Sequence, residues 1–252
     1  MLNPLDLTGK TILVTGASSG IGQGTAIYLS RLGAKVVAVG RDESRLNETV
    51  SKMEGDGHRA VSFDLNEVEK IPAWMKELSA AAGPLFGLVH SAGIAYNRPL
   101  KVVSYKNLLD MQRVNVDAGI LLAKGFRQLG VCEPGGSSIV LIASVAALKG
   151  EPALAGYSAT KGALISLTRT LGVELAPQKI RVNCISPALV MTQMADGVRN
   201  TLPPENMEQL EKKHPLGLGT TDDVAYTIAC LLAPGARWIT GANIVLDGGY
   251  TA

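Results

Sequence analysis

The chain has 252 residues, of which 46% are hydrophobic, and its 24 basic and 22 acidic residues leave a net charge of +2. This length is enough for a large buried core, and α/β folds of this size are commonly a single domain. The lack of a basic tract argues against nucleic-acid binding. The lack of an apolar run of roughly 20 residues argues against a membrane span, and the first ten residues have no secretory-signal pattern. We therefore expect a cytoplasmic protein.

Strand-like and helix-like segments alternate along the chain. Short, continuous apolar runs predict strands at 11–14, 35–39, 60–63, 85–90, 138–142, 180–185 and 243–246. Helical periodicity predicts helices between them, at 22–32, 43–53, 67–81, 105–129, 156–175 and 222–232. Continuous apolar strands are typical of a parallel sheet covered on both faces. We therefore predict an α/β, Rossmann-like, doubly wound parallel sheet of about seven strands; an eight-stranded barrel is the alternative and needs another strand.

No shift in composition marks a domain boundary, so residues 1–252 are predicted to form one domain. The alternation of strands and helices is interrupted at about 188–219, where prolines surround a polar helical patch. A long insertion directly after a strand often covers a ligand. We expect this segment to form a substrate loop.

The first predicted strand leads into a glycine-rich turn, TGASSGIG at 15–22, and then into a helix. Unpaired amides and the positive end of the helix dipole would bind a pyrophosphate there. Gly16 would free the chain for the turn, while Ser18, Ser19 and the amide of Ile21 would contact the phosphates. Close packing of a helix on a sheet is the alternative explanation of these glycines.

The second predicted strand ends in Gly40 and Arg41. A site specific for NAD usually has a carboxylate here, which accepts hydrogen bonds from the ribose hydroxyls. Gly40 offers no carboxylate, and the guanidinium of Arg41 is suited to bind a phosphate in bidentate fashion. The pattern predicts NADP(H). A solvated Arg41, neutralised by Asp42 and Glu43, is the alternative.

Tyr157 and Lys161 lie four residues apart in a predicted helix and so share one face of it. A carbonyl that receives a hydride also needs a proton, and Tyr157 could supply it if Lys161 and an oxidised nicotinamide lower its pKa from about 10. Ser144, at the end of a predicted strand, would hydrogen-bond the substrate oxygen. Ser144 lies in no Gly-x-Ser-x-Gly motif, which argues against a serine hydrolase.

The histidines and cysteines predict no metal site. His58 and His214 are expected at the surface, whereas His90 ends a strand near the expected cofactor site and is either a packed or a functional residue. The cysteines are widely spaced, lack CxxC motifs, and are expected to be reduced core thiols: Cys132, Cys184 and Cys230.

Taken together, these motifs resemble short-chain dehydrogenases/reductases of the single-domain type over nearly the whole chain, and in pattern most closely the bacterial 3-oxoacyl-[acyl-carrier-protein] reductases. Further positions match in order: Asp64, Ser91-Ala92-Gly93, Asn115, Pro187 with Thr192, and Ile-Thr-Gly at 239–241. The resemblance implies an NADP(H)-dependent oxidoreductase that transfers a hydride between nicotinamide and a carbonyl or secondary alcohol. The partner would be a small molecule.

The resemblance also assigns roles to residues. Lys161 would hold the nicotinamide ribose, and a proton relay would run from Tyr157 through ribose and Lys161 to a water carried by Asn115. Asp64, unless it is an ordinary turn aspartate, and the amide of Leu65 would contact the adenine. Other cofactor contacts are expected at the loops that follow the fourth and sixth strands: Ser91, Ala92, Gly93, Pro187, Val190 and Thr192.

Two positions depart from the family pattern. Ser91 replaces an asparagine that ties adjacent strands, so fewer ties are expected there. Ala188 replaces a glycine, which is harmless if the backbone φ is negative and alters the nicotinamide pocket if it is not.

The substrate is less defined. Carrier-protein reductases often have arginines beside the cleft, and Gly135 and Gln178 occupy these places here, with only Lys179 and Arg181 nearby. This favours a small carbonyl compound, such as a ketone, a sugar-derived ketone or a free acyl thioester. The insertion contains residues that either adapt to a substrate or pack within the loop: Met191, Met194, Met207 and Arg199.

Two further expectations remain open. A catalytically silent dinucleotide sensor is the alternative to an enzyme, although such proteins usually lose the tyrosine or the lysine. A homo-oligomer, specifically a tetramer, is expected from the family and from leucines beyond one sheet-facing stripe on two long helices: Leu108, Leu121, Leu122, Leu164, Leu167 and Leu171.

Overall fold

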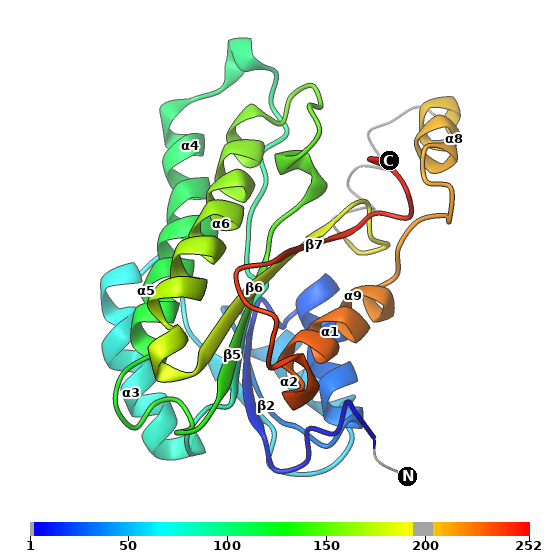
Figure 1. The fold of residues 1–252 in the computed structure, drawn as a ribbon. Helices are drawn as coiled ribbons and strands as arrows, with labels where there is room; N and C mark the ends of the chain where they lie inside the picture. The colour runs from blue at the N-terminus through cyan, green and yellow to red at the C-terminus, as the bar shows by residue number, and fades with distance from the viewer. Residues whose placement is uncertain (1–2, 194–203) are drawn as a thin grey trace.

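The structure is a computed structural model and describes residues 3–193 and 204–252. A seven-stranded parallel sheet in the order β3-β2-β1-β4-β5-β6-β7 runs through it (Figure 1). The strands are β1 (Thr11–Thr15), β2 (Lys35–Gly40), β3 (Arg59–Ser62), β4 (Gly87–His90), β5 (Ser137–Ile142), β6 (Ile180–Pro187) and β7 (Asn243–Leu246). This is the predicted doubly wound sheet, and the strand order reverses between β1 and β4.

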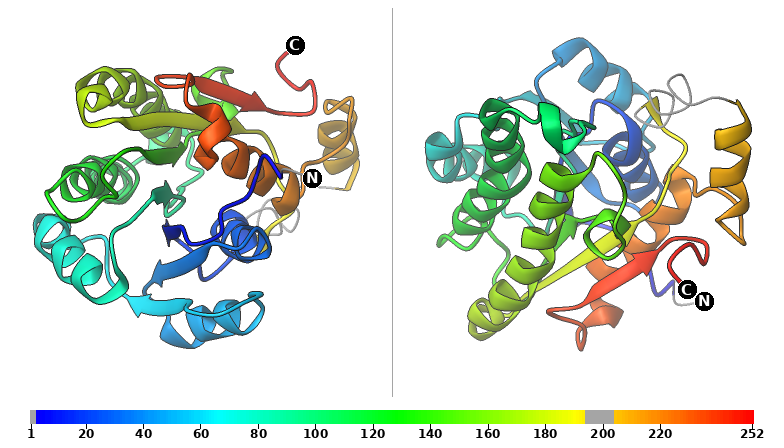
Figure 2. Two further views of the ribbon diagram at one scale, coloured as in Figure 1. Left: turned by 60° about the horizontal axis from the view of Figure 1, so that its bottom comes forward. Right: turned by 90° about the horizontal axis from the view of Figure 1, so that it is seen from above.

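Helices cover both faces of the sheet (Figures 1 and 2). One face packs against α3 (Ile71–Ala82), α5 (Ala118–Phe126) and α6 (Ala155–Glu174), and the other against α1 (Gly20–Arg31), α2 (Glu43–Ser51) and α9 (Thr221–Leu232). Two short elements lie beyond these layers: α4 (Tyr105–Gln112) and α8 (Pro204–Lys212).

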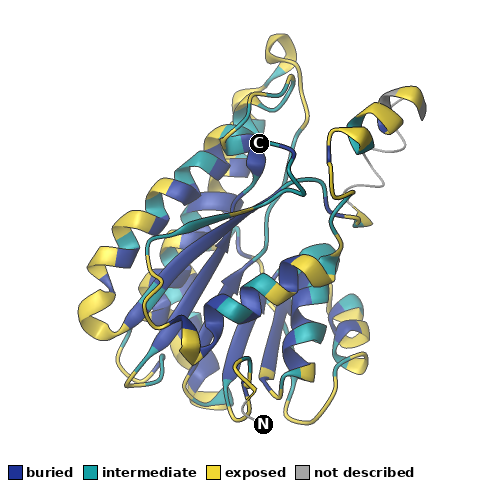
Figure 3. Cartoon of the chain, turned by 45° about the vertical axis from the view of Figure 1, so that its right-hand side comes forward, coloured by how far each residue is buried: buried dark blue, intermediate teal, exposed yellow. Residues whose placement is uncertain are grey.

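Successive side chains of the central strands enter opposite hydrophobic clusters. In β1, Leu13 packs with Met75 and Phe126 on one face, whereas Ile12 and Val14 belong to the cluster on the other face. The central strands are accordingly buried on both sides, as Figure 3 shows, whereas the edge strands β3 and β7 are partly exposed. This explains why the strands are continuous apolar runs in the sequence.

Two predicted helices differ from those observed. The segment 105–129 is not one regular helix, because a π-helical turn at Arg113–Asp117 separates α4 from α5. Extra residues of this kind inside helices are frequent at functional sites. The segment 67–81 begins with a 3₁₀ turn at Val68–Lys70, and α3 starts only at Ile71, where Pro72 suits the first helical turn.

The predicted insertion at 188–219 leaves and rejoins the fold at one point. Val190 forms a parallel bridge with Gly219, and the amide of Met191 donates to the carbonyl of Gly219 at 2.8 Å. Met194 and Arg199, which the sequence analysis named, lie outside the described residues.

The end of the insertion is held by the C-terminal segment. The ring of Tyr250 stacks on His214, with centroids 4.5 Å apart, and its hydroxyl donates to Glu151. The ammonium of Lys149 lies 3.8 Å from the centroid of the Tyr250 ring. His214 is 4% exposed, so the prediction of a surface histidine is wrong there; Tyr250 covers it.

Candidate active site

The candidate site lies where the strand order reverses, beyond the carboxyl ends of β1 and β4. Parallel α/β sheets bind ligands at this point. A Cβ on Gly16 would lie 2.8 Å from Cα and N of Ala92, and the φ of Gly16 is +68°. Glycine is therefore required twice over at this position, for the turn and for the contact between two loops.

The turn after β1 presents the amino end of α1. Ser19 is the N-cap residue, its side chain makes no capping hydrogen bond, and the first turn of the helix holds no acidic residue. A Cβ on Gly22 would lie 2.3 Å from the carbonyl oxygen of Gly16, so glycine lets the helix start against the turn. Uncapped amides without a competing carboxylate fit the pyrophosphate of a dinucleotide, with Ser18 and Ile21 in the same turn.

The end of β2 carries an unpaired cation. Arg41 is exposed, and within residues 3–193 and 204–252 its guanidinium forms no ion pair. Asp42 instead caps α2, accepting from the amide of Arg45 at 3.0 Å. A Cβ on Gly40 would lie 3.4 Å from the hydroxyl oxygen of Ser18, so the end of β2 adjoins the phosphate turn.

Asp64 and Leu65 lie at the end of the neighbouring strand β3. One carboxylate oxygen of Asp64 accepts from the amide and the side chain of Asn66, at 3.0 and 2.9 Å. Leu65 is buried and packs in the core. The exposed Asp64 thus forms a turn, and its second carboxylate oxygen is the group that the predicted adenine contact would use.

The loop after β4 is tied to β1 by Thr15, which the sequence analysis did not identify. The Thr15 hydroxyl accepts from the amide of Ala92 at 3.2 Å. Ser91, at the place of the usual asparagine, makes no side-chain hydrogen bond to the described residues. The buried Thr15 on the adjacent strand therefore supplies a hydrogen bond between β1 and the loop after β4, which Ser91 does not. The only feature of the sequence that points to Thr15 is its place directly before the glycine-rich turn.

Tyr157 and Ser144 come together from α6 and the end of β5. Desolvation raises the pKa of Tyr157 above its ordinary value, and a hydrogen bond with Ser144 acts in the opposite direction. The amide of Ala146 also donates to the Ser144 hydroxyl, at 3.2 Å. The structure thus brings together the predicted proton donor and the predicted partner of the substrate oxygen.

Lys161 lies one helical turn along from Tyr157. Its ammonium is 5.5 Å from the centroid of the Tyr157 ring and donates to the carbonyl of Ile142 at 2.7 Å. Lys161 is 4% exposed, and this burial lowers its pKa to about 8. Clusters of buried titratable groups with shifted pKa values are typical of functional sites.

Asn115 is the central residue of the π turn and is completely buried. Its side chain accepts from the amide of Ile94 at 2.8 Å and donates to the carbonyl of Ile94 at 2.9 Å and to the Thr160 hydroxyl at 3.0 Å. A Cβ on Gly93 would lie 3.2 Å from the Asn115 oxygen and 3.5 Å from the ammonium of Lys161. Gly93 therefore lets the loop after β4 approach both residues.

The loop after β6 closes the other side of the site. Thr192 reaches the amino end of α1, since its Cγ2 would lie 3.4 Å from a Cβ on Gly20. Its hydroxyl donates to the carbonyl of Val190 at 3.2 Å. Pro187 ends β6, and Ala188 is not among the described non-glycine residues with positive φ, so the alanine is accommodated without strain.

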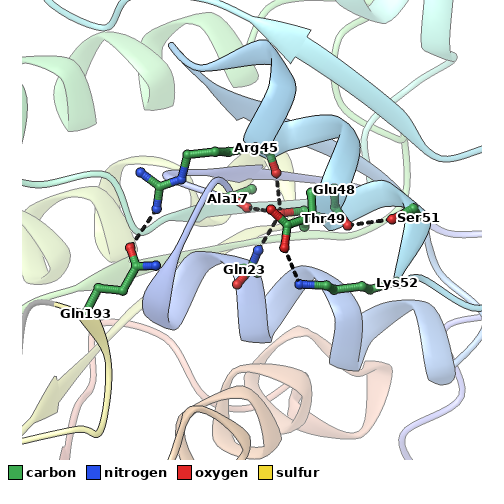
Figure 4. Close-up of polar contacts among 8 residues, drawn as sticks. All are labelled: Ala17, Gln23, Arg45, Glu48, Thr49, Ser51, Lys52 and Gln193. Carbon is green, nitrogen blue, oxygen red and sulfur yellow. Dashed lines mark hydrogen bonds and ion pairs between the residues drawn. The ribbon is translucent and has the colours of Figure 1, made fainter.

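Thr49 of α2 supports the phosphate turn and was also not identified from the sequence. It is completely buried, and its hydroxyl accepts from Gln23 at 2.9 Å. The hydroxyl donates to the carbonyl of Ala17 and to that of Arg45 in its own helix, each at 2.9 Å, so the two carbonyls share one hydrogen. Figure 4 shows this contact, together with Arg45, whose guanidinium donates to the side chain of Gln193 at 2.7 Å. The two contacts join α2 to the turn and to the loop after β6. Their partners are far apart in sequence, so no local pattern reveals them.

None of the helices in the described residues combines the length and the apolar character needed to cross a membrane. The same residues hold no group of three or more histidine, cysteine or acidic side chains that could bind a metal ion.

Comparisons with known proteins identify the family. A family model described as enoyl-(acyl carrier protein) reductase matches residues 16–251. An L-xylulose reductase of Cavia porcellus is 35% identical, over 98% of this chain and 99% of that protein, and the carbonyl reductase [NADPH] 2 of Sus scrofa is 34% identical, over 98% and 99%. A solved structure from Brucella melitensis, described as a short-chain dehydrogenase/reductase and glucose/ribitol dehydrogenase, superimposes with a TM-score of 0.90 at 31% identity and 98% coverage of both chains. The chain belongs to the short-chain dehydrogenase/reductase family, as the sequence motifs predicted.

Thr49→Val should weaken the phosphate turn. The substitution keeps the shape but leaves the Ala17 carbonyl and the Gln23 amide without their buried partner, which typically costs about 1–3 kcal/mol. We expect a lower melting temperature together with weaker dinucleotide binding, measured by thermal unfolding and fluorescence titration. Thr168→Val is the matched control, because the equally buried Thr168 hydroxyl bonds to Leu164, at 2.8 Å, and to the side chain of Cys184, and neither belongs to the phosphate turn or to α1. Equal effects of the two substitutions on binding would contradict a specific role for Thr49.

Proposed function

We propose that this short-chain dehydrogenase/reductase uses NADP(H) to interconvert a small carbonyl compound and its secondary alcohol. The observation that carries the proposal is the cluster of Ser144, Tyr157 and Lys161 beside a dinucleotide-type turn. The similarity to a carbonyl reductase named for NADPH supports the cofactor. Bound NADPH would supply the hydride, and the residues of this chain would bind it and manage the proton.

The phosphate turn and the end of β2 would hold the cofactor. The amides at the start of α1, with Ser18 and Ser19, suit the pyrophosphate, and Gly16 provides the space. Arg41, free of ion pairs in the described structure, suits a 2′-phosphate. The remaining contacts proposed for the adenine, ribose and carboxamide come from four other segments: Asp64, Leu65, Ser91, Ala92, Gly93, Lys161, Pro187, Val190 and Thr192.

Tyr157 would give the proton to the substrate oxygen, and Ser144 would hold that oxygen. In the protein alone, desolvation raises the pKa of Tyr157, so its hydroxyl is protonated but a weak acid, and the positive charges of Lys161 and of an oxidised nicotinamide would lower this pKa. In the direction of alcohol oxidation the phenolate is needed, and the positive charge of Lys161 would favour it. Asn115 would carry the far end of the proton path that passes Lys161.

A free small carbonyl compound is the proposed substrate class. Arg181, one of the few cations near the places where carrier-protein reductases have arginines, is not available to an acidic partner. Its guanidinium donates to the carbonyls of Leu232 and Ala233, at 3.1 and 3.4 Å. Gln178 accepts from Arg127 at 3.2 Å. Of the loop methionines, Met207 is buried, so it packs within the fold, whereas Met191 is 36% exposed.

Tyr157→Phe should lower kcat by about 10²–10⁴-fold, because it removes the proton donor and keeps the ring. NADPH binding should stay close to normal. The measurement is NADPH oxidation with a panel of ketones, sugar-derived ketones and acyl thioesters, together with a binding titration. Tyr28→Phe, a change of the same kind at a partly buried residue of α1 that packs against the core, is the control. Retained activity of the Tyr157 variant would reject the assigned acid, and NADPH binding without turnover of any carbonyl by the parent protein would favour a sensor.

Arg41→Ala should raise KM for NADPH and leave NADH nearly unaffected. A hydrogen bond to a charged group contributes roughly 1.5–3 kcal/mol, or about ten- to a hundred-fold in affinity. Adding Gly40→Asp should reverse the preference, because the carboxylate repels the phosphate and accepts from the ribose. The fold has room for it, since a Cβ there meets its neighbours at 3.4 Å or more.

Steady-state kinetics with both cofactors tests this cofactor switch. Arg59→Ala is a suitable control, because Arg59 is exposed at the start of β3 and not at its carboxyl end. A parent enzyme that prefers NADH would contradict the proposed preference for NADP(H). An Arg41 variant that binds both cofactors equally more weakly would contradict it as well.

We also propose a homotetramer. Most of the leucines first considered do not support it: Leu122 and Leu164 are buried, three others pack against the core, and Leu108 is 38% exposed. Two separate surfaces do expose large apolar side chains, one on the helices α4 to α6 and one near α9 and β7: Tyr105, Leu109, Ile120 and Val173, then Tyr226, Trp238 and Val245. Two such surfaces suit a tetramer with two kinds of two-fold interface. Sedimentation at micromolar concentration should give a tetramer, and a monomer would contradict the proposal.

A further inference from the structure

His90 lies beneath the two loops of the candidate site, and the mechanism above gives it no role. It is the last residue of β4 and pairs in register with Thr15, the last residue of β1. Its side chain is buried, and Nδ1 lies 3.0 Å from the Thr15 hydroxyl. Nε2 is also buried and has no hydrogen-bond partner in the part of the chain that the structure describes. One ring nitrogen is thus engaged and the other is not.

The Thr15 hydroxyl determines which ring nitrogen carries the proton. Its oxygen already accepts from the amide of Ala92, at 3.2 Å. Among the described residues, Nδ1 is the only other hydrogen-bond partner of this hydroxyl, so the hydroxyl hydrogen finds an acceptor only if Nδ1 is the unprotonated nitrogen. The imidazole is accordingly in its neutral Nε2–H form, an assignment made from the hydrogen-bond pattern.

Nε2 lies next to Gly119 in the first turn of α5, directly after the π turn that carries Asn115. A Cβ on Gly119 would lie 3.2 Å from Cδ2 and 3.5 Å from Nε2 of His90, so this glycine lets α5 approach that edge of the ring. Burial, and then the charge of Lys161, lower the pKa of His90 to about 4, while the main chain of Asn115 and Val114 acts in the opposite direction. Main-chain carbonyl groups raise the pKa of a nearby imidazole because they accept hydrogen bonds from its protonated nitrogens. The ring therefore stays neutral, and its Nε2 edge lies against the segment that leads from the π turn into α5, with no hydrogen bond to the described residues.

We propose that His90 is a positioning residue for proton transfer, whose Nε2–H steadies the π turn around Asn115 while Nδ1 ties the same ring to Thr15 and the Ala92 loop. This inference rests on the proposed function. The ring spans from the cofactor loops to the proposed proton path, and it fixes their spacing. His90 transfers no proton itself and acts through Asn115.

Two substitutions separate the roles of the two ring nitrogens. The amide of asparagine reaches about as far as Nδ1, so His90→Asn keeps a partner for Thr15 and loses the N–H at the π turn. The amide of glutamine reaches about as far as Nε2, so His90→Gln restores that N–H. His90→Phe keeps the bulk of the ring and loses both the partner for Thr15 and the N–H at the π turn. Each variant is assayed with NADPH and the best carbonyl substrate of the panel, and its melting temperature and NADPH affinity are measured in parallel.

We expect His90→Asn to lower kcat about ten- to a hundred-fold, the range seen when a reacting group is misplaced by about 1 Å. Its KM for NADPH should be unchanged, and His90→Gln should recover most of kcat. Parent-like kcat in both amide variants would overturn the proposal, and so would equal losses in both that follow melting temperature. The opposite order, with His90→Asn active and His90→Gln impaired, would assign the role to the Thr15 bond and reject the role of Nε2.

A measurement independent of turnover tests the tautomer. The ring nitrogens of the ¹⁵N-histidine-labelled full-length protein are observed by NMR at neutral pH, and the signals missing in His90→Gln identify His90. The neutral Nε2–H pattern is expected, whereas an Nδ1–H or imidazolium pattern would overturn the proposal. Failure of the parent protein to reduce any carbonyl would reject the proposed function and leave this result unaffected, so the two failures are distinguishable.

Discussion

The close contact between the loops that follow β1 and β4 sets the geometry of the whole candidate site. The two strands pair in parallel register up to Thr15 and His90, so both loops leave the sheet at the same level. Any side chain on Gly16 would collide with Ala92, at 2.8 Å for the first atom. Because the Thr15 hydroxyl binds the Ala92 amide, the contact is fixed by a hydrogen bond as well as by shape. A displacement of one loop would therefore move the other.

The same contact brings the phosphate turn close to the titratable groups. Gly93 follows Ala92 and approaches both Asn115 and Lys161, so the position of this loop determines how far the turn lies from the buried ammonium. Burying an ammonium group is costly. The hydrogen bond to Ile142 offsets part of this cost, and the pKa of about 8 shows that a part remains. The fold thus maintains a destabilised charge beside Tyr157, a condition under which small changes in the surroundings alter protonation.

Residues whose role depends on local backbone geometry could be predicted from the sequence. The seven strands follow from apolar runs that end in turns, and Gly16 and Gly22 follow from a strand–turn–helix pattern in which the turn and the close approach of the helix leave no room for a side chain. Tyr157 and Lys161 were paired correctly because helical periodicity alone places them on one face. Arg41 was placed at the end of β2 for a similar reason. In each case the information lies within a few positions of the residue itself.

Residues that act across the fold were missed, and the reason is physical. Thr15 and Thr49 bind groups that are distant in sequence through their hydroxyls, and a buried threonine in a strand or helix looks the same whether its hydroxyl is used or not. His90 was noted near the cofactor site, but the sequence could not distinguish a packed residue from a functional one. The π turn at Arg113–Asp117 was missed because one extra residue per turn barely changes the apolar periodicity. The surface prediction for His214 failed because its cover, Tyr250, comes from the far end of the chain. Local sequence patterns thus identify the proposed reactive side chains, whereas the spacing between them is set by contacts that exist only once the sheet has formed.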